Sequence, residues 1–92
     1  MKFEFDPAKS KMNASSRGLT FELAETFEWG TAIFSQDSRT DYGETRIVAL
    51  GFLEQRLHVI CFTPIDSGVR IISFRKANKR EVRYYEQETL NR

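Results

Sequence analysis

The residues best suited to chemistry form a basic cluster in the C-terminal half of the chain. Fourteen consecutive positions hold six cationic side chains: Arg70, Arg75, Lys76, Lys79, Arg80 and Arg83. A guanidinium offers a phosphate two parallel donors, and an ammonium offers a compact positive charge. Arg75 falls where a β-branched and aromatic run gives way to a helix-compatible run. The sequence therefore predicts a phosphate-binding cation at this junction, with Lys76, Lys79 and Arg80 binding the same substrate.

Cleavage of RNA is one reaction that such residues can support without a cofactor. The 2′-hydroxyl of RNA attacks the adjacent phosphate, so a protein has to position the backbone, neutralise the developing charge and move protons. Arg75 is the predicted charge-stabilising residue, and His58 and Tyr85 are candidates for proton transfer. The structural alternatives stay open: Arg75 as a cation at a strand end, His58 as a strand residue, and Tyr85 as a core residue.

The sequence lacks the residue patterns that metal, cofactor and nucleophile chemistry require. The single His and single Cys do not have metal-ligand spacing, so we expect no zinc site. The chain has no Gly-rich phosphate loop, dinucleotide fingerprint or nucleophile elbow, and we expect no cofactor. Asp37, Asp41 and Glu44 are interpreted as a solvated acidic loop rather than a cation site.

Length and composition indicate one small globular domain over residues 1–92. The chain is 40% hydrophobic and 13% aromatic, whereas disordered segments are poor in aromatic residues. Cys61 lies in an apolar run and is expected to be a buried thiol, which fits a reducing compartment. The N-terminus lacks a signal-peptide pattern, and no apolar run approaches the roughly 20 residues of a membrane span. We therefore expect a soluble, cytoplasmic protein without a membrane partner.

The charge is distributed unevenly along the chain. Residues 1–45 carry five Lys or Arg and eight Asp or Glu, whereas residues 46–92 carry nine and five, for a formal net charge of +1. The C-terminal half is therefore the half expected to meet a polyanion.

Strand and helix patterns alternate in a way that predicts an α+β fold. A short strand around Phe3 and Phe5 precedes a helix from Pro7 to Arg17, with Asp6 as its cap and Gly18 as its stop. A second helix is expected from Thr20 to about Gly30, and a last helix from Ala77 to about Leu90. Between them lie four predicted strands, joined by short links: residues 31–35, 44–51, 56–63 and 69–75. The prediction is an antiparallel β meander with two N-terminal helices and one C-terminal helix.

The short links also suggest a register, with Gly51 opposite Arg56 and Thr63 opposite Val69. One face is then the expected core and collects Val48, Leu50, Leu57, Val59, Cys61, Val69 and Ile71. The other face is expected to be mixed and partly open, with Ile47, Ile60, Ile72, Phe74, Arg56, His58, Phe62 and Arg70. In this register Arg46 and Arg75 lie roughly 15 to 20 Å apart and need not contact one phosphate.

Several short motifs occur in order along nearly the whole chain. They are residues 3–9, Asn13 with residues 18–24, residues 42–46 with Gly51, residues 56–60 with Thr63, residues 70–77, Glu81 and Tyr85. With these motifs the chain resembles the BrnT toxins of bacterial BrnT/BrnA toxin–antitoxin modules.

The resemblance implies a RelE-like toxin fold and a metal-independent endoribonuclease that inhibits translation. It implies RNA as the substrate and a BrnA-like antitoxin as the protein partner in a hetero-oligomer, with promoter DNA bound only through the antitoxin. It further implies that Arg75 stabilises the transition state and that Arg46, Thr63 and Lys9 contact the substrate or support the site.

One motif departs from the family pattern. BrnT-like chains commonly have Lys-His-Gly at the end of the first helix, whereas this chain has Ser16, Arg17 and Gly18. Arg17 keeps a positive charge for the substrate but stays protonated and is no general base. Two alternatives to the ribonuclease therefore stay open: a catalytically weakened RNA- or antitoxin-binding module acting in transcriptional autoregulation, and a plain protein-interaction domain.

Overall fold

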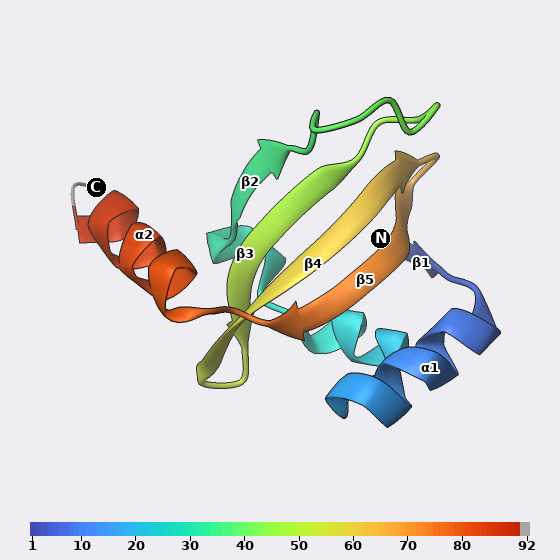
Figure 1. Ribbon diagram of the computed structural model, residues 1–92, viewed down its shortest axis with the longest axis horizontal. Helices are drawn as coiled ribbons and strands as arrows, with labels where there is room; N and C mark the ends of the chain where they lie inside the picture. Colours follow the sequence, from blue (N-terminus) through green and yellow to red (C-terminus); the bar gives the residue numbers. More distant parts are fainter. Residues whose placement is uncertain (91–92) are drawn as a thin grey trace.

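A five-stranded sheet forms the centre of the computed structural model, which describes residues 1–90 (Figure 1). The predicted domain end at Arg92 lies outside the described residues. The elements in chain order are β1 (Lys2–Glu4), α1 (Pro7–Arg17), the 3₁₀ helices η1 (Phe21–Thr26) and η2 (Trp29–Thr31), β2 (Ile33–Gln36), β3 (Ile47–Leu53), β4 (Arg56–Ile65), β5 (Gly68–Lys76) and α2 (Lys79–Leu90). The α+β class is as predicted.

The sheet is mixed, which corrects the predicted antiparallel meander. Its order is β1-β5-β4-β3-β2, and β1 pairs with β5 in parallel while the other three pairs are antiparallel. Gly68 makes this parallel pair possible, because a Cβ atom at this position would collide with the backbone of Lys2. The first strand therefore lies beside the last one, a long-range pairing that short links between strands do not predict.

Helix α1 has the predicted bounds and the predicted caps. The Asp6 carboxylate accepts a hydrogen bond from the Ala8 amide at 2.9 Å, and Gly18 ends the helix with φ +73°. Polar side chains join α1 to the rest of the fold: Ser10 Oγ accepts from the Phe21 amide, and Asn13 Nδ2 donates to the carbonyl oxygens of Leu19 and Phe74.

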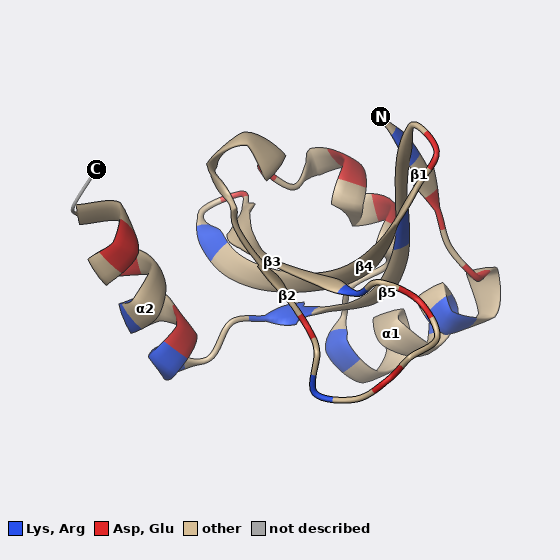
Figure 2. Cartoon of the chain, turned by 90° about the horizontal axis from the view of Figure 1, so that it is seen from above, with Lys and Arg blue, Asp and Glu red and all other residues tan. Residues whose placement is uncertain are grey.

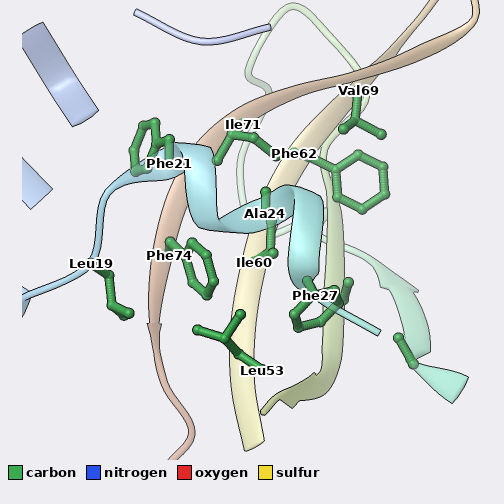
Figure 3. Packing of buried hydrophobic residues seen from close by; sticks show 12 residues of the cluster. Leu19, Phe21, Ala24, Phe27, Leu53, Ile60, Phe62, Val69, Ile71 and Phe74 are labelled. Carbon is green, nitrogen blue, oxygen red and sulfur yellow. The ribbon is translucent and has the colours of Figure 1, made fainter. Parts of the chain in front are cut away.

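The predicted second helix is replaced by the two 3₁₀ helices. In a 3₁₀ helix residues three apart lie above one another. Phe21 and Ala24 of η1 therefore point to the same side, and Phe27 follows them into the core. Figure 3 shows these three side chains over Ile60, Ile71 and Phe74 of the sheet. The apolar spacing was recognised correctly, but its helix type was wrong.

The main core lies on the sheet face that we expected to be partly open. Its buried strand residues are Ala49, Leu53, Ile60, Phe62, Val69, Ile71 and Phe74, and the partly buried Ile47 packs against them. Figure 3 labels Leu53, Ile60, Phe62, Val69, Ile71 and Phe74. Gly51 pairs with His58 rather than Arg56, and Thr63 pairs with Arg70 rather than Val69. An irregularity between Cys61 and Phe62 breaks the two-residue alternation, so Ile71 and Phe74 share a face although they are three residues apart. The one-residue slip at Thr63 moves Val69 and Ile71 to the other face, whereas the two-residue shift at Gly51 keeps each side chain on its face.

The opposite face carries a smaller apolar cluster under α2. Leu50, Leu57, Val59, Ala77 and Tyr85 are buried there. Helix α2 lies to one side of the sheet, and the extended chain after β5 leads to it (Figure 1). The same face continues beyond this cluster with Val48, Cys61, Ser73 and Arg75, which line an open groove.

Candidate functional site

An open groove of about 580 Å³ runs over the sheet face opposite the main core. Strands β3, β4 and β5 form its floor, the loop between β2 and β3 forms one wall, and Glu81 enters from α2. The titratable residues of the groove are three arginines, two carboxylates, a tyrosine and a cysteine: Arg39, Arg46, Arg75, Asp37, Glu81, Tyr42 and Cys61. Among the lining residues the three guanidiniums exceed the two carboxylates by one, and Glu44, outside the lining, pairs with Arg46.

Arg75 lies in the groove and is held by α2. Its Nη1 and Nη2 each donate to a different oxygen of Glu81 at 2.9 Å, and its side chain is 39% exposed. Glu81 is itself fixed, because it accepts from the Asn78 amide while Asn78 Oδ1 accepts from the Glu81 amide. This reciprocal pair is a capping box at the start of α2. The helix cap therefore also sets the position of the predicted catalytic cation.

The ion pair sets the protonation of both partners. Hydrogen bonds from Arg75 lower the pKa of Glu81, and those to Glu81 raise the pKa of Arg75. The positive charge of Arg39 acts on Arg75 in the opposite direction, because two like charges share the groove. Both members of the pair are therefore ionised at neutral pH.

Arg46 lines the same groove as Arg75, and the expected separation between the two residues along the sheet stays a prediction. Its guanidinium carbon lies 4.0 Å from the centroid of the Tyr42 ring, and its Nε donates to Glu44 at 3.4 Å. Thr63 Oγ1 donates to the same Glu44 carboxylate at 3.0 Å. These bonds lower the pKa of Glu44, the bond from Thr63 having the largest effect. Thr63 is thus buried behind the groove and supports Arg46 through Glu44.

Arg39 is a groove residue that the sequence did not reveal. Asp37 binds it with two parallel bonds of 2.9 Å, from Nε to Oδ1 and from Nη2 to Oδ2. The bonds from Arg39 lower the pKa of Asp37 to about 2, and the Tyr42 hydroxyl donates to the same carboxylate. The available signal was the Asp-x-Arg spacing in a loop, which we interpreted as a solvated acidic segment.

Five predicted substrate-binding residues lie outside the groove lining of the described chain. Lys9 and Arg17 are exposed on α1, and Lys79 and Arg80 are exposed in the first turn of α2. Lys76 pairs with His58 at the end of β5 and borders a separate hollow. Figure 2 shows the corresponding basic positions spread over α1, α2 and the sheet. Their roles in RNA binding remain predictions.

The two candidates for proton transfer are built into the fold. His58 is 4% exposed, packs against Phe74, and its Nδ1 lies 2.7 Å from the Arg56 carbonyl oxygen. Burial lowers the pKa of His58. The Tyr85 hydroxyl donates to the Thr31 carbonyl oxygen at 2.9 Å and joins α2 to η2. Neither residue lines the groove in the part of the chain that the structure describes.

The acidic loop forms ion pairs, and the cysteine lies in the groove. Asp37 and Glu44 bind Arg39 and Arg46, and the described residues contain no group of three or more His, Cys, Asp or Glu that could hold a metal ion. Cys61 is half-buried in the groove rather than fully buried, and burial raises the pKa of its thiol. No helix among residues 1–90 is both long and apolar enough to cross a membrane.

Figure 2 shows the loop between β2 and β3 extending from the sheet with charged positions along it, and residues of this loop line the groove. A small α+β fold with this cationic groove matches the family model of the ribonuclease toxins of type II toxin–antitoxin systems over residues 5–81. The matched region contains every residue that lines the groove. The class is therefore that of the type II ribonuclease toxins. Within it, the chain belongs to the BrnT family.

A solved structure has the same fold. The crystal structure of the Brucella abortus ribonuclease toxin BrnT, at 1.1 Å resolution, is similar with a TM-score of 0.68 and 25% sequence identity. The similarity covers 86% of this chain and 99% of that chain. The comparison with curated protein sequences gave no match.

Proposed function

We propose that the protein is a metal-independent endoribonuclease toxin whose groove binds the RNA backbone. The observation that carries this proposal is the presence of Arg46 and Arg75 in one groove, within the region that matches the BrnT family. Cleavage of RNA would inhibit translation, and the reaction would occur in the cytoplasm. The RelE-like relationship of the fold remains a prediction.

The reaction uses the nucleophile of the substrate. The 2′-hydroxyl loses its proton to water as its oxygen bonds to the adjacent phosphorus, and the bond to the 5′-oxygen breaks as that oxygen takes a proton from water. The products are a 2′,3′-cyclic phosphate and a 5′-hydroxyl. Negative charge accumulates on the non-bridging oxygens in the transition state, where fixed cations stabilise it most. Arg75 supplies this charge, and Arg46 binds the backbone beside it.

The groove is less suited to proton transfer than to charge stabilisation. Asp37 and Glu81 are the carboxylates of the groove, and both have a lowered pKa because arginines donate to them. A carboxylate with a lowered pKa is a poor general base near neutral pH. Positioning and charge stabilisation therefore supply most of the expected rate enhancement.

The same pairing supports the second candidate, a weakened module that binds RNA or an antitoxin. Both terminal nitrogens of Arg75 are occupied by Glu81, and the only histidine of the chain is buried in the fold. In this alternative the groove binds without cleaving.

A BrnA-like antitoxin is the proposed protein partner, with promoter DNA bound only through it. Phe34 is 49% exposed on the edge strand β2 and stacks on Trp29 with ring centroids 6.5 Å apart. An exposed aromatic residue on an unpaired strand edge is a suitable docking point for a protein.

The test is cleavage of an unstructured RNA in EDTA. The wild type is expected to cleave, Arg75→Ala to lose at least about 100-fold in rate, and Arg83→Ala to retain it. Arg83 is an exposed arginine of α2 outside the groove and controls for loss of charge. Unchanged cleavage by a folded Arg75→Ala variant would contradict the role of Arg75. Binding without cleavage by the wild type would favour the second candidate.

A further inference from the structure

We propose that Arg39 is a substrate-positioning residue, which binds a backbone phosphate of RNA next to the phosphate held by Arg75. This inference rests on the proposed ribonuclease function and assigns a second phosphate contact to the same groove. Its basis is the geometry of the loop between β2 and β3.

Arg39 is both fixed and exposed, a combination that suits ligand binding. Asp37 holds its Nε and Nη2 in a bidentate pair, yet its side chain is 84% exposed. Most exposed arginines must lose rotamer freedom when they bind a ligand. Asp37 has already restricted that freedom in Arg39, and Nη1 lies outside the pair. A phosphate can therefore bind Arg39 with a smaller loss of entropy.

The loop that carries Arg39 is closed at its base and braced inside. The Asp37 amide donates to the Arg46 carbonyl oxygen at 2.8 Å, which joins the two ends of the loop. The Asp37 carboxylate, whose side chain is only 6% exposed, binds both Arg39 and the Tyr42 hydroxyl. Tyr42 in turn stacks under Arg46. One carboxylate therefore orients one cation directly and supports a second through Tyr42.

The groove brings Arg39 and Arg75 together with no carboxylate shared between them. Arg39 pairs with Asp37, whereas Arg75 pairs with Glu81. Two like charges in one groove repel each other, and an anion between them relieves this repulsion. RNA is the polyanion favoured here, because the groove also offers the partly exposed ring of Tyr42 to an unpaired base.

The test measures binding of a fluorescent single-stranded RNA whose 2′-hydroxyls are methylated, so that it cannot be cleaved. We expect Arg39→Gln to weaken binding roughly five- to tenfold and to lower the slope of log affinity against log salt by about 0.7. Arg83→Gln makes the same charge change outside the groove and should weaken binding less than twofold. Equal effects of the two variants would overturn the proposal.

A second variant separates positioning from net charge. Asp37→Asn removes a negative charge, so general electrostatic attraction predicts tighter binding. Positioning by Asp37 instead predicts weaker binding, because the bidentate pair that orients Arg39 is lost. Glu88→Gln on α2 makes the same charge change as a control. Tighter binding by Asp37→Asn than by Glu88→Gln would overturn the positioning role.

The binding measurements with methylated RNA do not depend on whether the protein cleaves RNA. If the wild type binds the methylated RNA through Arg39 but does not cleave ordinary RNA, the proposed catalysis fails and this inference stands. If the wild type cleaves ordinary RNA while Arg39→Gln binds and cleaves as well as Arg83→Gln, the inference fails and the proposed function stands. Binding of an acidic peptide through Arg39, with no binding of the methylated RNA, would also overturn the inference.

Discussion

The contacts of Arg75 with its neighbours determine how readily it can bind a phosphate. Its position at the end of β5 could be predicted, but its bidentate pair with Glu81 could not. A phosphate has to share Arg75 with this carboxylate or displace it. Under the proposed function, the strength of the pair would therefore tune the affinity of the groove for RNA.

Replacing Glu81 by Gln tests this competition. A glutamine at this position can still cap α2, because Gln also occurs in capping boxes. Removal of the competing negative charge should raise the affinity for methylated RNA about threefold to tenfold. The measurement is a fluorescence titration beside Glu88→Gln, whose charge change lies outside the groove. Weaker binding by Glu81→Gln would mean that Glu81 mainly positions Arg75.

Burial of His58 should make the stability of the fold depend on pH. Burial lowers the pKa of His58 below its ordinary value of 6.5. Below about pH 6.5 the unfolded chain therefore binds more protons than the folded chain, and stability falls as the pH falls toward the folded pKa. Urea unfolding at about pH 7.5 and about pH 5.5 measures this loss.

The variant His58→Gln is the control for that experiment. Glutamine keeps an N–H donor for the Arg56 carbonyl oxygen but does not titrate. Its stability should change less between the two pH values than that of the wild type. An equal change in both proteins would assign the pH dependence to another group.

At the scale of elements, the fit between the η1–η2 segment and β3 depends on a glycine. A Cβ atom at Gly51 would lie 2.8 Å from Cζ of Phe27 and 3.0 Å from Cβ of Ala32. Gly51→Ala should therefore lower the free energy of unfolding by about 1 to 3 kcal/mol. Gly30→Ala is the matched control, since its Cβ would meet no described atom within 4 Å. Equal stability of the two variants in urea would show that Phe27 can move aside.

The Tyr85 hydroxyl contributes to the attachment of α2, beside the small apolar cluster and the Arg75–Glu81 ion pair. Tyr85 donates to the Thr31 carbonyl oxygen and packs its ring edge-on against Phe52 at 5.4 Å. Tyr85→Phe should destabilise this attachment by about 1 kcal/mol and speed amide exchange in α2 several-fold. Tyr84→Phe removes an exposed hydroxyl and should leave exchange unchanged. Hydrogen exchange that is the same in both variants would remove this role from Tyr85.

Across the whole molecule, stability should decrease from the sheet centre toward α2. Strands β4 and β5 each pair on both sides and carry Ile60, Ile71 and Phe74 of the main core, whereas α2 is held by a small cluster and one ion pair. Amides of β4 should exchange at least about tenfold more slowly than those of α2. Native-state hydrogen exchange measures the relative exchange rates of these two elements. Slower exchange in α2 would mean that helix and sheet open together.

The sequence by itself determined the features that depend on neighbours along the chain. Asp6, Pro7 and Gly18 predicted both ends of α1, and runs of β-branched residues predicted the strands and placed Arg75 where the last strand leads into the final helix. Caps act within one turn and strand patterns within one element, so a local pattern suffices for them. The ordered motifs along the chain also indicated the BrnT family, which the family model confirms.

The tertiary structure alone decided which face is the core and which residues meet in the groove. A one-residue register error and the irregularity beside Cys61 moved Val69 and Ile71 to the other face, because strand side chains alternate with a period of two. The packing of η1 on the face of Ile60 and Phe74 decided which face holds the main core. Arg39, Arg46, Arg75 and Glu81 come from a loop, two strand ends and a helix, and their approach depends on long-range pairing. Sequence patterns report the period of each element but not how one element is placed against another.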